Sequence, residues 1–168
     1  WQQAGNPEKE RGYARLAGAY AYQQHDHVTA VFYFSRAIEL TPVDDLAEKH
    51  DLLLAREEVY HLQGNRNAQK DDLTQLAEIA DRLSTESGRE WRTAAALRLG
   101  RFAEVTGRYT VAIVAASEAL RLATMTKAPA QEAASNLLWG QALLRQGKYE
   151  QAQEKLQFSL THARAHEQ

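Results

Sequence analysis

Histidine is the first candidate for metal or acid–base chemistry in this chain of 168 residues, which has six histidines and no cysteine. The lack of cysteine excludes disulfides, thiolate metal sites and cysteine nucleophiles. His25 and His27 flank Asp26, and His162 and His166 are four residues apart, the spacing of a metal-binding pair on a helix. The pattern places no further ligand near the first pair, and the second pair lies at the end of the chain. We therefore expect surface histidines and no metal.

Adjacent carboxylates are the second candidate for acid–base chemistry. Neighbouring side chains on a helix point about 100° apart, so two of them rarely enter one site. We therefore expect these pairs to serve solubility: Asp44-Asp45, Glu57-Glu58 and Asp71-Asp72.

A glycine-containing segment near the end of the chain is superficially like a phosphate loop. Gly140 precedes Gly147-Lys148-Tyr149, but six residues separate the glycines instead of four, and tyrosine stands where a phosphate loop has serine or threonine. No serine and histidine stand in a nucleophile-elbow or triad arrangement. We therefore predict a non-enzymatic protein without a cofactor.

The composition favours an all-helical protein that works away from membranes and nucleic acids. Hydrophobic residues make up 44% of the chain, with only three prolines. No apolar run approaches the roughly 18 residues that cross a bilayer, and a net charge of −2 argues against direct nucleic-acid binding. Residues 1–88 carry nine basic and fifteen acidic residues, whereas residues 89–168 carry eleven and seven. The asymmetry fits either a solvated surface or a polar array that meets a partner of complementary charge.

Apolar residues recur at three-to-four spacing through most of the chain, which predicts amphipathic helices. The three prolines, Pro7, Pro42 and Pro129, all mark expected helix starts. The predicted helices are 7–24, 27–40, 43–63, 66–83, 89–106, 109–125, 129–146 and 149–166.

The helices pair into an internal repeat. Gly18, Gly100 and Gly140 each precede a turn residue by seven positions and an alanine by twelve, at Ala30, Ala112 and Ala152. We expect each glycine to let its helix approach that alanine closely, and Gly64, Gly107 and Gly147 to end helices in the left-handed conformation. Gly88 is expected between repeats. The copy around Gly64 has Glu57 and Gln69 where the small residues should be, so its helices are expected to splay.

This pattern resembles the tetratricopeptide repeat family, which has a small residue at the eighth place, glycine and tyrosine at the turn, and alanine at the twentieth. The repeats on this register are 11–44, 50–83, 93–126 and 133–166. The turn positions 25, 64, 107 and 147 lie about 40 residues apart, longer than the usual 34. The resemblance implies one all-α domain over residues 1–168, a right-handed superhelical array of antiparallel helix pairs. Because the chain begins with Trp1, we expect it to be part of a larger protein.

In that family the first helices of the repeats line a concave face. The resemblance implies that the corresponding residues here bind a partner: Arg15, Tyr22, Asp51, Leu54, Glu58, His61, Leu97, Arg101, Glu104, Leu137, Gln141 and Arg145. Ala19, Glu58 and Arg101 occupy the ninth place, so the carboxylate clamp of some family members is absent.

Two functions remain open at this point. The first is a cytoplasmic protein–protein interaction scaffold, whose groove binds a peptide or helix of a partner or of another domain of the parent chain, with self-association through uncapped ends. The second is an effector-sensing arm of a bacterial STAND-type signalling ATPase or transcription regulator. The second interpretation depends on segments 1–5 and 52–64, which resemble the helical arrays of those proteins.

Overall fold

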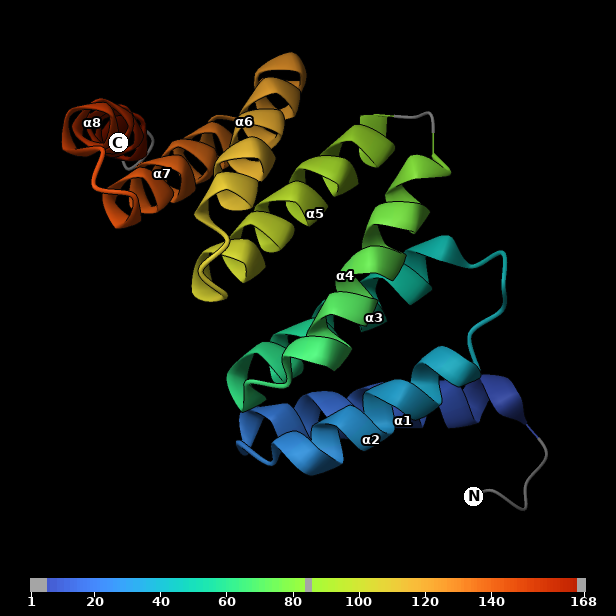
Figure 1. The fold of residues 1–168 in the computed structure, drawn as a ribbon. Helices are drawn as coiled ribbons and strands as arrows, with labels where there is room; N and C mark the ends of the chain where they lie inside the picture. Colours follow the sequence, from blue (N-terminus) through green and yellow to red (C-terminus); the bar gives the residue numbers. More distant parts are fainter. Residues whose placement is uncertain (1–5, 84–85, 166–168) are drawn as a thin grey trace. The chain divides into compact units, whose positions relative to one another are not determined.

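The computed structural model of the protein describes residues 6–83 and 86–165, with the side chains in these ranges except at 86–87 and 162–165. Every element in this part of the chain is an α-helix (Figure 1). The helices are α1 (Pro7–Gln23), α2 (His27–Glu39), α3 (Leu46–Gln63), α4 (Arg66–Asp81), α5 (Glu86–Val105), α6 (Tyr109–Thr126), α7 (Pro129–Arg145) and α8 (Tyr149–Ala165). None of the described helices is both long and apolar enough to cross a bilayer.

Local polar contacts explain where the first helices begin. Asn6 Oδ1 accepts a hydrogen bond from the Lys9 N–H at 3.0 Å, and Pro7 follows in the first helical position. Asp26 caps α2 in the same way by accepting from the Thr29 N–H at 3.1 Å. All eight predicted helices are confirmed, with boundaries that agree to within three residues.

Two predicted helix starts are wrong by three residues. α3 begins at Leu46 and not at residue 43, because Asp45 is the residue that accepts from the Glu48 N–H, at 3.2 Å. α5 begins at Glu86 and not at residue 89, so Gly88 lies in the first turn of a helix and not in a linker.

The turn within each repeat has the same geometry four times. The backbone φ is +59° at His25, +69° at Gly64, and +75° at both Gly107 and Gly147, which confirms the prediction for the three glycines. After each of these residues the next N–H donates to the carbonyl five positions earlier, at 2.7 to 3.0 Å. This is the six-to-one bond of a Schellman motif, which satisfies carbonyls at the end of the first helix. His25 adopts the left-handed conformation without glycine, so the motif persists where the sequence signal for it is missing.

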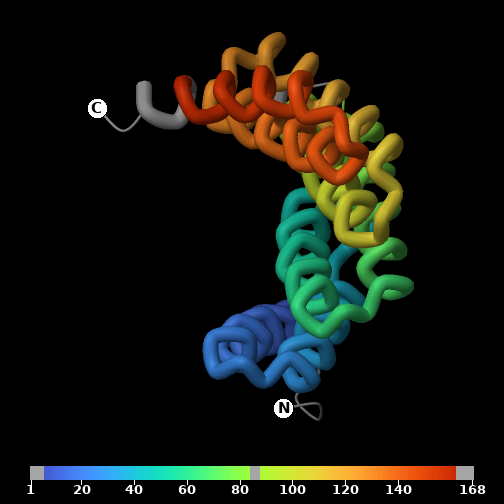
Figure 2. Tube along the Cα trace, turned by 60° about the vertical axis from the view of Figure 1, so that its left-hand side comes forward, coloured from blue at the N-terminus to red at the C-terminus, as the bar shows by residue number. Residues whose placement is uncertain are grey.

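The chain forms two compact units, Trp1–Ile79 and Ala80–Gln168. In the first unit α2 packs between α1 and α3, and α1 and α2 lie side by side in both views (Figures 1 and 2). Small residues and one aromatic ring fill the space between these helices: Ala14, Ala21, Ala30, Phe34, Ala37, Leu52 and Val59.

The second unit repeats this arrangement with α5 to α8. α6 packs against α5 and α7, and α7 packs against α8. One buried cluster joins Leu97, Ala116, Ala119 and Leu138, and another joins Ala103, Ala112 and Ala142. The second cluster consists of alanines alone, and the first pairs two alanines of α6 with one leucine each from α5 and α7.

The glycines inside the first helices make room for a large side chain of the second helix. A Cβ added at Gly18 would lie 2.8 Å from the Phe34 ring. A Cβ added at Gly140 would lie 2.7 Å from Leu156 Cγ and 3.3 Å from the carbonyl oxygen of Ala152. Close approach is thus confirmed at both glycines. The nearest atoms belong to a residue one turn beyond the predicted alanine, and at Gly140 that alanine makes the next contact.

Candidate functional site

An exposed stripe on α7 carries three of the predicted binding residues. Leu137, Gln141 and Arg145 lie at intervals of four residues, and all three are exposed. The exposed fraction of Leu137 is 44%. Leu144, which the sequence analysis did not include, continues the stripe seven residues after Leu137 and is 42% exposed. The i, i+4, i+7 spacing that places these residues on one side of a helix could have identified Leu144.

An ion pair joins this stripe to the neighbouring first helix. Arg145 Nε lies 3.4 Å from Glu104 Oε1 of α5, and α5 packs against α7. The Arg145 side chain is 66% exposed, so the pair contributes less than about 1 kcal/mol to stability. The ion pair nevertheless shows that Glu104 of α5 and Arg145 of α7 lie on the same side of the helix pair. We call this surface the α5–α7 face: Arg101, Glu104, Leu137, Gln141, Leu144 and Arg145.

Leu97 is the exception among the predicted residues of this unit. It is only 8% exposed and belongs to the buried cluster that includes Ala116, Ala119 and Leu138. Leu97 therefore holds α5 in the core and does not line an open surface. The register gave it the same place in its helix as Leu137, but packing covers one leucine and leaves the other accessible.

The predicted residues of the first unit lie on α1 and α3. Arg15 is exposed, and its Nε lies 3.8 Å from a carboxylate oxygen of Glu48. Tyr22 is 36% exposed, and Asp51 is 72% exposed in its side chain. Three more residues from α3 are half-buried: Leu54, Glu58 and His61. We call these six residues the α1–α3 face.

The repeat that departs most from the pattern replaces its small residues with a hydrogen-bonded pair. Gln69 Nε2 donates to Glu57 Oε1 at 2.7 Å, and the two residues are 2% and 3% exposed. Arg66 Nη1 in turn donates to Gln69 Oε1 at 2.7 Å. The two positions are twelve residues apart, like Gly140 and Ala152, so a polar contact takes the place of a close approach. It ties α3 to α4 at the point where the sequence predicted a splay.

A second buried polar contact joins the same two helices, between Arg56 of α3, which precedes Glu57, and Asp72 of α4. Arg56 donates to both carboxylate oxygens of Asp72 at 2.6 and 2.9 Å, and to Ser35 Oγ at 2.9 Å. Burial raises the pKa of Asp72, and the guanidinium of Arg56 opposes that rise. Because Asp72 and Glu57 are both buried, the interpretation of the carboxylate pairs as solubility residues is wrong for these two. They hold helices together.

The other candidates for chemistry do not converge on a site. Asp26 is occupied as the cap of α2, and the rings of His25 and His27 are 6.4 Å apart between centroids. No group of three or more metal-ligating side chains occurs in the described part of the chain. The side chains of His162 and His166 lie outside the described residues.

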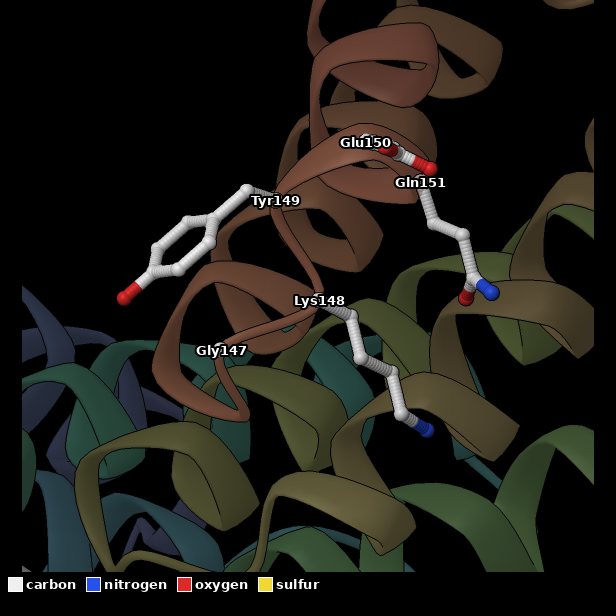
Figure 3. A pocket seen from close by; sticks show the side chains of 5 residues that line it. All are labelled: Gly147, Lys148, Tyr149, Glu150 and Gln151. Atoms are coloured by element: carbon white, nitrogen blue, oxygen red, sulfur yellow. The ribbon is translucent and has the colours of Figure 1, made fainter.

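An open hollow of about 340 Å³ lies at the turn between α7 and α8, at the segment that superficially resembled a phosphate loop. Figure 3 shows the Tyr149 side chain pointing to the opposite side from the side chains of Lys148 and Gln151. The N–H groups of Gly147 and Lys148 donate to carbonyls at the end of α7, so they do not form an anion cradle.

Comparisons with known proteins add no constraint to this geometry. No family model matches the chain. No curated protein matches it either. The function must therefore be argued from the surfaces described above.

Proposed function

We propose that the protein is a non-catalytic interaction scaffold of the tetratricopeptide type, in which the helix pairs follow a right-handed superhelical path. The four identical turns and the recurring glycine positions support the repeat assignment. Its function on this proposal is to bind a peptide or a helical segment of another protein, or of another domain of its parent chain, on the faces of the first helices.

The observation that carries the proposal is the composition of the α5–α7 face. Leu137 and Leu144 expose apolar surface on α7, the helix that also carries the exposed Arg145, and Arg101 is exposed on α5 three residues before Glu104. Arginine is among the residues that contribute most to binding at protein interfaces, and it binds carboxylates through two parallel hydrogen bonds. The exposed leucines add apolar contact area beside it. A face of this kind fits a segment that combines apolar side chains with a carboxylate.

The spacing of the two leucines defines the ligand further. Seven residues along a helix correspond to about 10 Å at 1.5 Å per residue. A bound helix would match this distance with apolar residues at i and i+7. A peptide in the polyproline II conformation would match it with residues at i and i+3, since that helix has three residues per turn and rises about 3.1 Å per residue.

Selection from a random peptide library displayed on phage tests the proposal. Clones enriched on the wild-type chain should bind it and should lose at least tenfold in affinity for Leu137→Glu/Arg145→Glu. The control is Val114→Glu, because Val114 is 62% exposed on α6, outside the α5–α7 face, and its replacement matches the Leu137→Glu part of the double variant. Enriched clones should bind that variant as tightly as the wild type.

Two outcomes would contradict the proposal. Clones that bind both variants equally would place the binding surface elsewhere. If no clone is enriched while a small molecule raises the melting temperature, the effector-sensing arm of a STAND-type protein becomes the better interpretation.

A further inference from the structure

The outer side of α1 exposes a second stripe of large side chains. Leu16 is 62% exposed and Tyr20 is 66% exposed, and Tyr13, at 54%, lies one turn before Leu16. The buried residues of α1 are Ala14, Gly18 and Ala21, which face α2. The stripe therefore lies on the side of α1 turned away from the core of its own unit.

The internal repeat shows what this side of a first helix normally contacts. On the repeat register, Tyr13, Leu16 and Tyr20 correspond to Leu52, Ala55 and Val59 of α3, and to Ser135, Leu138 and Ala142 of α7. Leu52 and Val59 are 2% and 0% exposed, and they belong to the cluster that contains Ala37 of α2. Leu138, at 3%, belongs to the cluster that contains Ala116 and Ala119 of α6. In both cases the covering element is the second helix of a helix pair, α2 or α6, and it places alanine at the contact.

The covering helix must offer small residues. Leu138 packs in a cluster with Leu97 of α5, and the residues that α6 contributes to this cluster are the alanines Ala116 and Ala119. Small residues on the second helix form the groove that a large side chain enters, because packed helices interlock the ridges of one with the grooves of the other. Leu16 and Tyr20 are larger than their counterparts Ala55 and Val59, so the partner of α1 needs an even deeper groove. An alanine stripe at three-to-four spacing provides it.

A second copy of the chain does not supply such a helix well. α8 is the helix that would present the corresponding side, and it has Ser159 where α2 has Ala37 and α6 has Ala119. It has Lys155 where α6 has Ala115, and the Lys155 amine lies over the Trp139 ring at 4.2 Å from its centroid. Pairing α1 with α1 of another copy would oppose large residues to large residues.

We propose that the outer face of α1, through Leu16 and Tyr20, docks an amphipathic helix of a partner protein that carries alanines or other small residues along its contact side. This surface is separate from the α5–α7 face and acts independently of it. The bound helix would extend the packing of the first unit in the same manner as α2 packs on α3.

The experiment uses a fluorescently labelled peptide with the sequence of residues 107–128, which contains the alanine stripe of α6. Its anisotropy is measured against the full chain, after sedimentation velocity has established the state of association. We expect saturable binding that weakens at least tenfold for Leu16→Glu. Phe32→Glu is the control, because Phe32 is 63% exposed on α2 and receives the same charge. A peptide carrying Ala119→Glu should bind at least tenfold more weakly.

Each other outcome overturns the proposal. No saturable binding, or equal losses for Leu16→Glu and Phe32→Glu, would show that the stripe is not a helix-docking surface. A wild-type dimer that Leu16→Glu converts to a monomer would show that a second copy occupies it. Neither Leu16→Glu nor Phe32→Glu changes a residue of the α5–α7 face. The result of this binding experiment is therefore independent of the result of the phage selection that tests the proposed function.

Discussion

Gly140 lies where α7 crosses α8, and its replacement by alanine tests how the repeats are packed. A Cβ at this position would lie 2.7 Å from Leu156 Cγ, 2.8 Å from Leu156 Cδ2 and 3.3 Å from the carbonyl oxygen of Ala152. Cγ is the branch point of the leucine and cannot move away by a simple rotation of its methyl groups. The backbone oxygen is fixed by the helix. One of the two helices must therefore shift.

Two opposed effects determine the size of the change. Overpacking a close helix contact destabilises by about 1 to 3 kcal/mol. Alanine inside a helix is about 0.5 to 1 kcal/mol more favourable than glycine. We therefore expect Gly140→Ala to lower the free energy of unfolding by about 1 kcal/mol, which corresponds to a drop of about 2 to 4 °C in melting temperature for a chain of this size.

Gly12→Ala is the matched control, since Gly12 also lies inside a helix but no atom lies within 4 Å of its added Cβ. Only the helix propensity changes there, so the same substitution should raise the free energy of unfolding by about 0.5 to 1 kcal/mol. Thermal and urea unfolding followed by circular dichroism would measure both. Equal effects of the same sign would refute the argument from close packing. The double variant Gly140→Ala/Leu156→Ala should lose less than the sum of its parts, because Leu156 is the clashing residue.

The remaining predictions concern a buried pair and a helix cap. Gln69→Ala should destabilise by about 1 to 3 kcal/mol, because it removes the buried hydrogen bond to Glu57. Combining it with Glu57→Gly recreates the glycine and alanine of the other repeats, so a double-mutant cycle by urea unfolding should give a coupling of about 1 kcal/mol or more, and strict additivity would contradict this view of the pair. Hydrogen bonds from the Thr29 side chain and backbone lower the pKa of Asp26 below its ordinary value. The folded state therefore binds this proton less tightly than the unfolded state, so the stabilisation is complete above about pH 4 and is lost as the pH falls through the lowered pKa. Asp26→Asn keeps a good cap and should lose less stability than the wild type between pH 6 and pH 2.5 in urea unfolding, whereas parallel curves would show that Asp26 contributes nothing to acid sensitivity.

The helices and turns could be predicted because their causes are local. Apolar spacing, capping residues such as Asn6 and the left-handed glycines act within a few residues of each other, and all eight helices occur where the pattern predicted them. The errors at residues 43 and 89 have the same local nature, since several nearby residues compete to cap a helix.

The candidate surfaces were predicted less completely because exposure depends on which helix covers a position. Leu97 and Leu137 occupy the same place in two repeats, yet the first is buried and the second is open. The spacing alone could not distinguish them. Leu144 could have been found from spacing, but only after Leu137 was known to be exposed.

The helical class, the positions of the helices and the left-handed conformation of Gly64, Gly107 and Gly147 were predictable from the sequence, because they follow from the intrinsic preferences of short segments. The roles of the residues that depart from the pattern became clear only from the packing of the helices. The sequence pattern predicted that the helices splay at Glu57 and Gln69, whereas the fold brings these two side chains to 2.7 Å in a buried hydrogen bond. Distances between side chains twelve residues apart depend on how two helices pack, and that packing is set by the whole set of contacts between them.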